Sequence, residues 1–305
     1  MWNKYWGGVL IMPKIINLCS FGHADPQIAG VFDDTIESVA NLVRLCGAFP
    51  VLLRNKIDPE GLNILWGAGT HFSPSLEILL QHCNIKNTII FNMEQIGSNS
   101  PLVTSSYLDF LSNFKVLDYS IHNIHVLRKK YPLINAEEFP LIPSPSFCYD
   151  SAGVFNEKKY HFAFYGALNE RRSKILEKIQ SYDIKIKNIT GAYGRNLSYE
   201  LSECQAVINI HAYETSLFES ARALRPVAMG IPIVSEISVM PQLVDWKCAP
   251  IKFVEYNDFT EYCIFAKKTN FSDLNIKNSG SQEFLYRYYS NSALLNSIRY
   301  LLGID

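Results

Sequence analysis

The side chains best suited to chemistry flank one helical stretch in the second half of the chain. Asn209 and His211 lie at the end of a short apolar run, and Glu219 and Arg222 lie in the Ala- and Leu-rich stretch 217–229 that follows. Ligands of doubly wound sheets bind beyond the carboxyl ends of the strands, so we expect these groups to gather there. A carboxylate that opens a helix can accept a ribose hydroxyl pair, and the helix N-terminus attracts phosphate. The pattern therefore predicts a nucleotide site with Glu219 on the ribose.

Two of these side chains allow a second interpretation. His211 could hydrogen-bond a phosphate or a sugar, although a histidine near a strand end is often a satisfied structural group. Its polar neighbours, Asn209, Tyr213 and Glu219, favour a binding role. Arg222 lies one helical turn after Glu219 on the same face, so it could orient that carboxylate, touch phosphate, or form only a surface ion pair.

Two glycine turns follow other predicted strands of this half. Gly166 permits close approach of the backbone, and Arg171 and Arg172 in the next helical turn could meet a diphosphate with bidentate geometry. Both arginines could equally be solvated helix residues. The turn with Tyr193 and Gly194 could admit a base or a ribose, or be a plain surface turn.

Candidate general bases lie in the first half of the chain. Glu94 and Asp118 follow successive predicted strands, and His23 lies in the loop after the first strand. Imidazole has a suitable pKa near neutrality, which supports His23. Asp118 also suits a helix-capping role. The residues favour His23 and Glu94 equally, with Asp118 third.

Apolar runs and helical stretches alternate along most of the chain, which is typical of βαβ units with parallel sheets. A link rich in Pro and Ser, residues 143–146, separates two such series. We therefore expect an α/β fold with two Rossmann-like domains, residues 12–145 and 156–280, followed by a C-terminal helix within 281–305. Two of the expected strands are Phe139 to Ile142 and Ile231 to Val234, and the expected C-terminal helix runs from Ser281 to Leu302.

Composition excludes several classes of protein. The 305 residues are 48% hydrophobic and 19% charged, with a formal net charge of -1, which argues against nucleic acid as a partner over a broad face. No apolar run approaches the length of about 18 residues that spans a bilayer, so we expect a cytoplasmic protein. Seven cysteines without a Cys-x-x-Cys pair indicate reduced thiols and make zinc unexpected.

The segment around Glu219 resembles the nucleotide-binding half of GT-B glycosyltransferases, especially the group similar to family 4. In that group a Glu opening a helix holds the ribose and a Gly-x-Pro-Val-like turn leads to the next strand; here Glu219 and the turn Gly230 to Ile233 take those places. The chain departs from the group at His211, where a first glutamate is usual, and in the longer spacing from Glu219 to Gly230.

The resemblance implies a function and assigns roles. A sugar would pass from a nucleotide-sugar donor to a hydroxyl of a glycan or lipid-linked acceptor, such as a surface polysaccharide, with peripheral contact at the inner membrane face as an option. Arg171 or Arg172 would neutralise the departing diphosphate, no metal or other cofactor would be needed, and the C-terminal helix would cross back to the first domain. A GT-B-type nucleotide-sugar epimerase and a catalytically silent sugar-binding protein are the alternatives. The Gly-x-Gly-x-x-Gly turn of nicotinamide-dependent oxidoreductases is absent.

Overall fold

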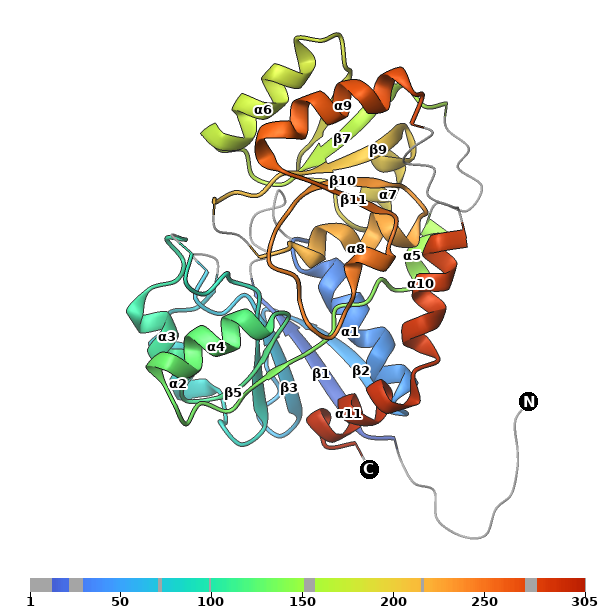
Figure 1. The fold of residues 1–305 in the computed structure, drawn as a ribbon. Coiled ribbons are helices and arrows are strands. Elements are labelled where there is room, and N and C mark those ends of the chain that lie inside the picture. Colours follow the sequence, from blue (N-terminus) through green and yellow to red (C-terminus); the bar gives the residue numbers. More distant parts are fainter. Residues whose placement is uncertain are drawn as a thin grey trace, which may run out of the picture.

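The computed structural model describes residues 13–21, 30–70, 73–98, 100–150, 157–214, 217–271 and 279–304. Two parallel sheets, each covered by helices, form a lower and an upper domain in Figure 1. Such sheets are buried on both faces, so their strands read as nearly continuous apolar runs. This explains why the alternating pattern predicts the α/β class correctly.

The first sheet has six strands in the order β2-β1-β3-β4-β5-β6. Its strands are β1 (Ile15–Ser20), β2 (Phe49–Arg54), β3 (Leu62–Trp66), β4 (Thr88–Asn92), β5 (Lys115–Asp118) and β6 (Ala136–Glu138). The helices between them are α1 (Asp33–Leu45), α2 (Leu76–His82), α3 (Ser105–Leu111) and α4 (Ile121–Lys130). The strand order reverses at β1, so the loops after β1 and β3 open on either side of a crevice at the carboxyl edge.

The second sheet has five strands in the order β11-β10-β9-β7-β8. Its strands are β7 (Tyr160–Tyr165), β8 (Ile186–Ile189), β9 (Cys204–Asn209), β10 (Ile233–Glu236) and β11 (Ile251–Val254). The helices are α5 (Ser146–Asp150), α6 (Glu170–Gln180), α7 (Gly194–Ser202), α8 (Ser220–Ala228) and α9 (Phe259–Lys268), with 3-10 turns at Trp246–Cys248 and Tyr256–Asp258. The loops after β7 and β9 therefore lead to neighbouring positions at the edge that holds the candidate residues.

Three predicted boundaries are wrong for identifiable reasons. Residues 139–142 form no strand because Pro140 has no N–H for a ladder, and only Phe139 N donates to the sheet, to Asp118 O at 2.7 Å. The strand expected at 231–234 lies at 233–236. The helix expected from residue 217 begins at Ser220, so Glu219 is its N-cap residue.

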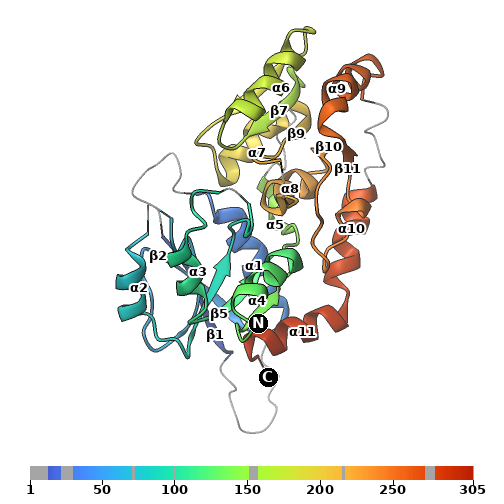
Figure 2. The same cartoon turned by 60° about the vertical axis from the view of Figure 1, so that its left-hand side comes forward.

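The expected single C-terminal helix is two helices, α10 (Ser279–Tyr289) and α11 (Ser292–Leu302). Asn291 separates them because its side chain accepts a hydrogen bond from Leu294 N at 3.0 Å and so caps α11. Figures 1 and 2 show α10 beside the upper domain and α11 beneath the lower one. Lys14 and Lys115 of the first domain donate to the last carbonyls of α11, those of Leu302 at 3.2 Å and Leu301 at 2.5 Å.

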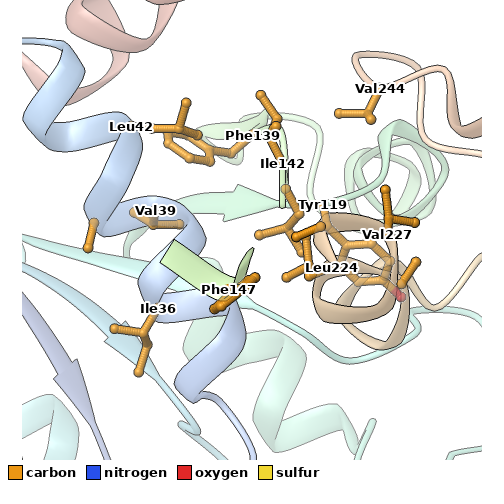
Figure 3. Packing of buried hydrophobic residues seen from close by; sticks show 14 of the residues in the cluster. Ile36, Val39, Leu42, Tyr119, Phe139, Ile142, Phe147, Leu224, Val227 and Val244 are labelled. Atoms are coloured by element: carbon orange, nitrogen blue, oxygen red, sulfur yellow. The ribbon is translucent and has the colours of Figure 1, made fainter. Parts of the chain in front are cut away.

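An apolar core continues across the seam between the two domains. Figure 3 shows Val39 of α1 and Leu224 of α8 with Phe139 and Phe147 around them. Phe139 follows β6 of the first sheet, and Phe147 lies in α5. Arg225 of α8 also reaches Asp34 of α1, with Nη2 2.7 Å from Oδ1, while its side chain is only 3% exposed. The two domains are therefore packed together by a buried interface. Within the described residues, no helix is both long and apolar enough to cross a membrane.

Candidate functional site

A cleft of about 280 Å³ lies between the turn after β4 and the start of α8. Both domains contribute to it, since Glu94 and Tyr119 come from the first and Glu219 and Arg222 from the second. The remaining lining residues are Met93, Gln95, Ser100, Leu102, Ala212, Tyr213, Ser220 and Ala221. The structure thus brings Glu94, Glu219 and Arg222 to one cleft, as expected if they share a site.

Glu219 is held between two arginines at the N-terminus of α8. Arg172 Nη2 donates to its two carboxylate oxygens at 2.9 and 3.0 Å, and Arg222 Nη1 donates to Oε2 at 2.9 Å. Burial alone would raise the pKa of Glu219, but the charges of Arg222 and Arg172 hold it below its ordinary value. The carboxylate is therefore ionised and fixed in place, as a ligand for hydroxyl groups must be.

Arg172 is a positioning residue in this arrangement. Its side chain is 5% exposed, and it also donates to Ile210 O at 2.8 Å and Ala167 O at 2.7 Å. These bonds engage its guanidinium within the protein. These contacts leave Arg172 holding Glu219 in place. Its expected contact with a diphosphate stays a prediction that this geometry does not favour.

Arg222 differs from Arg172 because it lines the cleft and keeps a donor available. Its Nη groups bind Glu219, Ile210 O and Tyr165 O, whereas Nε is buried and has no hydrogen-bond partner among the residues that the structure describes. Gly166 lies against this guanidinium with φ +120°, a conformation that favours glycine. Buried donors without a partner are rare, so Arg222 Nε marks a position where a ligand oxygen would be stabilised.

Within the described part of the chain, His211 and Asn209 at the end of β9 supply two more polar atoms without a hydrogen-bond partner. His211 is 1% exposed; its Nε2 lies 3.2 Å from Glu236 O, and its Nδ1 has no partner. Burial lowers the pKa of His211, so the ring is neutral, with its proton on Nε2 and an acceptor at Nδ1. Asn209 Nδ2 donates to Ser235 Oγ at 3.0 Å, and its Oδ1 is unpartnered.

Three other candidates lie outside the lining of this cleft. Arg171 forms a bidentate pair with Glu236, including Nη1 to Oε2 at 2.7 Å, and its guanidinium carbon lies 3.8 Å from the centroid of the Tyr256 ring. Tyr193 and Gly194 begin α7, and a Cβ on Gly30 would come within 2.5 Å of the Tyr193 side chain. Tyr193 thus contacts the first domain at Gly30, and the structure does not join it to Glu219.

The turn after β4 is fixed by two buried amides. Asn92 Nδ2 and Asn123 Nδ2 both donate to Glu94 O at 2.9 Å, and Glu94 N donates to Asn92 Oδ1 at 3.1 Å. The carboxyl of Glu94 remains at the cleft, where burial raises its pKa. A carboxyl with a raised pKa is a stronger proton acceptor once ionised, which suits a general base.

Asp118 lies behind this turn and does not reach the cleft. Its side chain is fully buried and accepts from Asn92 Nδ2 at 2.6 Å, Ser120 N at 2.8 Å and Asn123 Nδ2 at 3.0 Å. Burial raises its pKa to about 7 against the opposing effect of these donors. This arrangement suits a residue that supports the Glu94 turn, and the catalytic role considered for Asp118 stays a prediction, while His23 lies outside the described residues.

Sequence reasoning missed two polar residues that the site depends on. Glu236, at the end of β10, binds Arg171 and also accepts from His211 N at 3.1 Å. Gln95, beside Glu94, accepts from Leu217 N across the cleft at 3.2 Å. Glu236 follows an apolar run, as the predicted site residues do, and this signal could have identified it. The contact of Gln95 depends on how the two domains meet, which no local pattern encodes. The described residues contain no group of three His, Cys, Asp or Glu side chains arranged to hold a metal ion.

No protein-family model matches the chain. Among curated proteins, uncharacterized protein L137 of Acanthamoeba polyphaga mimivirus is 30% identical over 201 residues, which are 61% of this chain and 26% of that protein. Uncharacterized protein L140 of the same virus is 27% identical over 186 residues, 57% of each chain. This chain therefore spans only part of the length of these relatives.

Solved structures with the same architecture are GT-B glycosyltransferases. Sucrose-phosphate synthase from Thermosynechococcus elongatus has a TM-score of 0.56 at 12% identity, over 95% of this chain and 98% of that one. TarM has a TM-score of 0.56 at 12% identity, over 81% and 56%. An α,α-trehalose-phosphate synthase (UDP-forming) from Burkholderia vietnamiensis has a TM-score of 0.54 at 10% identity, over 81% and 73%. At these identities the likeness concerns the fold alone, and it confirms that this chain has the GT-B fold.

Proposed function

We propose that the protein is a glycosyltransferase that moves a sugar from a nucleotide-sugar donor to a hydroxyl of a glycan or lipid-linked acceptor. The observation that carries this proposal is the pairing, across one cleft, of the clamped carboxylate Glu219 with the base candidate Glu94. A protein that only binds a sugar would not need Glu94, a carboxyl whose pKa is raised, opposite Glu219, the carboxylate that binds the nucleotide.

The second domain supplies the donor site. Glu219 accepts the ribose hydroxyl pair, because two arginines keep it ionised and leave it little freedom to move. The diphosphate lies at the N-terminus of α8, where the helix dipole favours negative charge. Arg222 Nε adds a donor that no described residue of the protein engages. This contact would strengthen as charge develops on the departing diphosphate.

The first domain supplies the base. The acceptor oxygen attacks the anomeric carbon, the bond from that carbon to the diphosphate breaks, and Glu94 takes the proton of the attacking hydroxyl. The fixed backbone of the Glu94 turn supports this role, since proton transfer requires a well-positioned acceptor. This route inverts the configuration of the sugar. His23 remains the second candidate for the base.

A direct test begins with donor binding. The trehalose-phosphate synthase is named as UDP-forming, so we choose UDP and UDP-sugars as the first probes and GDP and ADP as comparisons. Isothermal titration calorimetry should detect binding of one nucleoside diphosphate to the wild type and weaker binding to Glu219→Gln. The control is Glu137→Gln, since Glu137 lies on the surface, 50% exposed, opposite Arg128. Equal affinities in the two variants would contradict the donor site.

Turnover is then measured by mass spectrometry with a panel of glycan and lipid-linked acceptors. Glu94→Gln should strongly lower transfer and leave nucleotide binding intact. If His23 is the base, His23→Ala should have this effect instead. Isomerisation of the nucleotide sugar without any acceptor would indicate an epimerase. Binding without turnover by the wild type would indicate a sugar-binding protein.

A further inference from the structure

A hydrogen bond across the cleft attaches the segment before α8 to the first domain. Gln95, next to Glu94, lines the cleft, and its Oε1 accepts from the backbone N–H of Leu217 at 3.2 Å. Leu217 lies two residues before Glu219 and is 4% exposed. A backbone donor can meet only the oxygen of the amide, so the orientation of the Gln95 side chain is determined by this contact.

Both ends of this bond are anchored. On the first domain, Asn92 and Asn123 fix the carbonyl of Glu94, and Ser98 Oγ donates to Gln95 O at 2.7 Å. On the second domain, Leu217 pairs with Val239 in an isolated parallel bridge. The neighbouring Phe218 N donates to Val239 O at 2.9 Å. A side chain that joins two rigid segments transmits the position of one to the other.

We propose that Gln95 is a positioning residue. It sets the distance between Glu94, the base on the first domain, and Glu219, the side chain that binds the ribose on the second. The inference rests on the proposed function. Glu94 and Gln95 are adjacent on one fixed turn, and Leu217 and Glu219 lie two residues apart on one fixed segment. This hydrogen bond therefore joins the turn that carries the proton acceptor, Glu94, directly to the segment that carries Glu219. Loss of this bond would leave the Glu94 turn and the Glu219 segment each intact and would change only the distance between them.

The test compares two variants of similar length. Gln95→Met removes the acceptor, whereas Gln95→Glu keeps an oxygen that can accept from Leu217 N. With donor and acceptor saturating, Gln95→Met should lower kcat about tenfold, the scale of one hydrogen bond, and Gln95→Glu should restore most of it. The affinity for the nucleoside diphosphate that binds the wild type should change less than about twofold in both variants, because the donor site lies within the second domain.

Amide hydrogen exchange gives a second readout that does not depend on turnover. In Gln95→Met the N–H of Leu217 should exchange about tenfold faster, while the N–H of Phe218, bound to Val239 O, should be unchanged. Unchanged exchange at Leu217, unchanged kcat in Gln95→Met, or failure of Gln95→Glu to recover kcat would each overturn the inference. A wild type that neither binds a nucleotide nor turns over would refute the proposed function and, with it, the positioning role.

Discussion

Replacing Glu219 by Gln should destabilise the protein as well as weaken nucleotide binding. The change removes a negative charge that Arg172 and Arg222 each contact at 2.9 Å. The side chains of the two arginines are 5% and 12% exposed, respectively. Two unit charges about 4 Å apart attract by about 4 kcal/mol at an effective dielectric constant near 20. Removing one partner of a buried pair costs about 3–5 kcal/mol. Because Gln retains one acceptor oxygen, we expect a loss of about 3 kcal/mol.

Urea denaturation at pH 7 measures this loss as a change in the free energy of unfolding. The matched control is Glu137→Gln, whose pair with Arg128 spans 3.7 Å between half-exposed side chains. Exposed pairs of this kind contribute less than about 1 kcal/mol. If Glu219→Gln lost no more stability than Glu137→Gln, the two arginines would not depend on Glu219 and the reasoning would be refuted.

The effect of Glu219 should also depend on pH in a defined direction. Its pKa in the folded protein lies below the ordinary value, because Arg222 and Arg172 outweigh the effect of burial. The stability it contributes is therefore complete above the pKa of the unfolded chain and is lost as the pH falls through the folded pKa. The difference in the free energy of unfolding between wild type and Glu219→Gln should accordingly shrink in acid. A difference that grew in acid would show that another group causes the pH dependence.

Three further changes test the surroundings of the site. Glu94→Gln should lower turnover by a factor of about 100 to 10,000. The wild-type rate should fall as the pH drops through the raised pKa of Glu94, because the base must be ionised, and a flat pH–rate profile would exclude Glu94 as the base. Asp118→Asn places an amide donor against the donor of either Asn92 or Ser120 and should cost about 1–3 kcal/mol in urea denaturation, whereas unchanged stability would mean that these bonds contribute little. Arg225→Met should cost about 3–5 kcal/mol because it removes the buried cation that pairs with Asp34 at the seam, and the double variant with Asp34→Asn should recover part of the loss; strictly additive losses would show that the two side chains are not coupled.

The fold could be predicted because its determinants are local. Buried parallel strands are apolar runs of a few residues, and the helices between them show their own period, so the order of elements follows from composition along the chain. The errors occur where a single residue changes the backbone hydrogen bonding. Pro140 prevents a further strand, and Asn291 caps α11 and so divides the expected C-terminal helix.

The site was predictable only in part, because its geometry depends on tertiary contacts. Glu219 and Arg222 stand out through a spacing that places them on one helix face. Arg171 and Arg172 are adjacent in sequence, and neighbouring residues of a helix point about 100° apart, so only one of them could meet Glu219. The sequence does not tell which, and the structure selects Arg172. The burial of Asp118 is likewise set by the residues packed over it from other elements.

The way in which the chain passes between its two domains restricts how they can move. It crosses once through residues 139–145 and again where α10 leads into α11, and Tyr289 OH donates to Pro143 O at 2.7 Å to bind these two crossings together. Two adjacent tethers joined in this way leave one preferred rotational degree of freedom, about an axis that runs through them, and resist sliding and twisting. Any widening of the space between Glu94 and Glu219 would then be a rotation about this line.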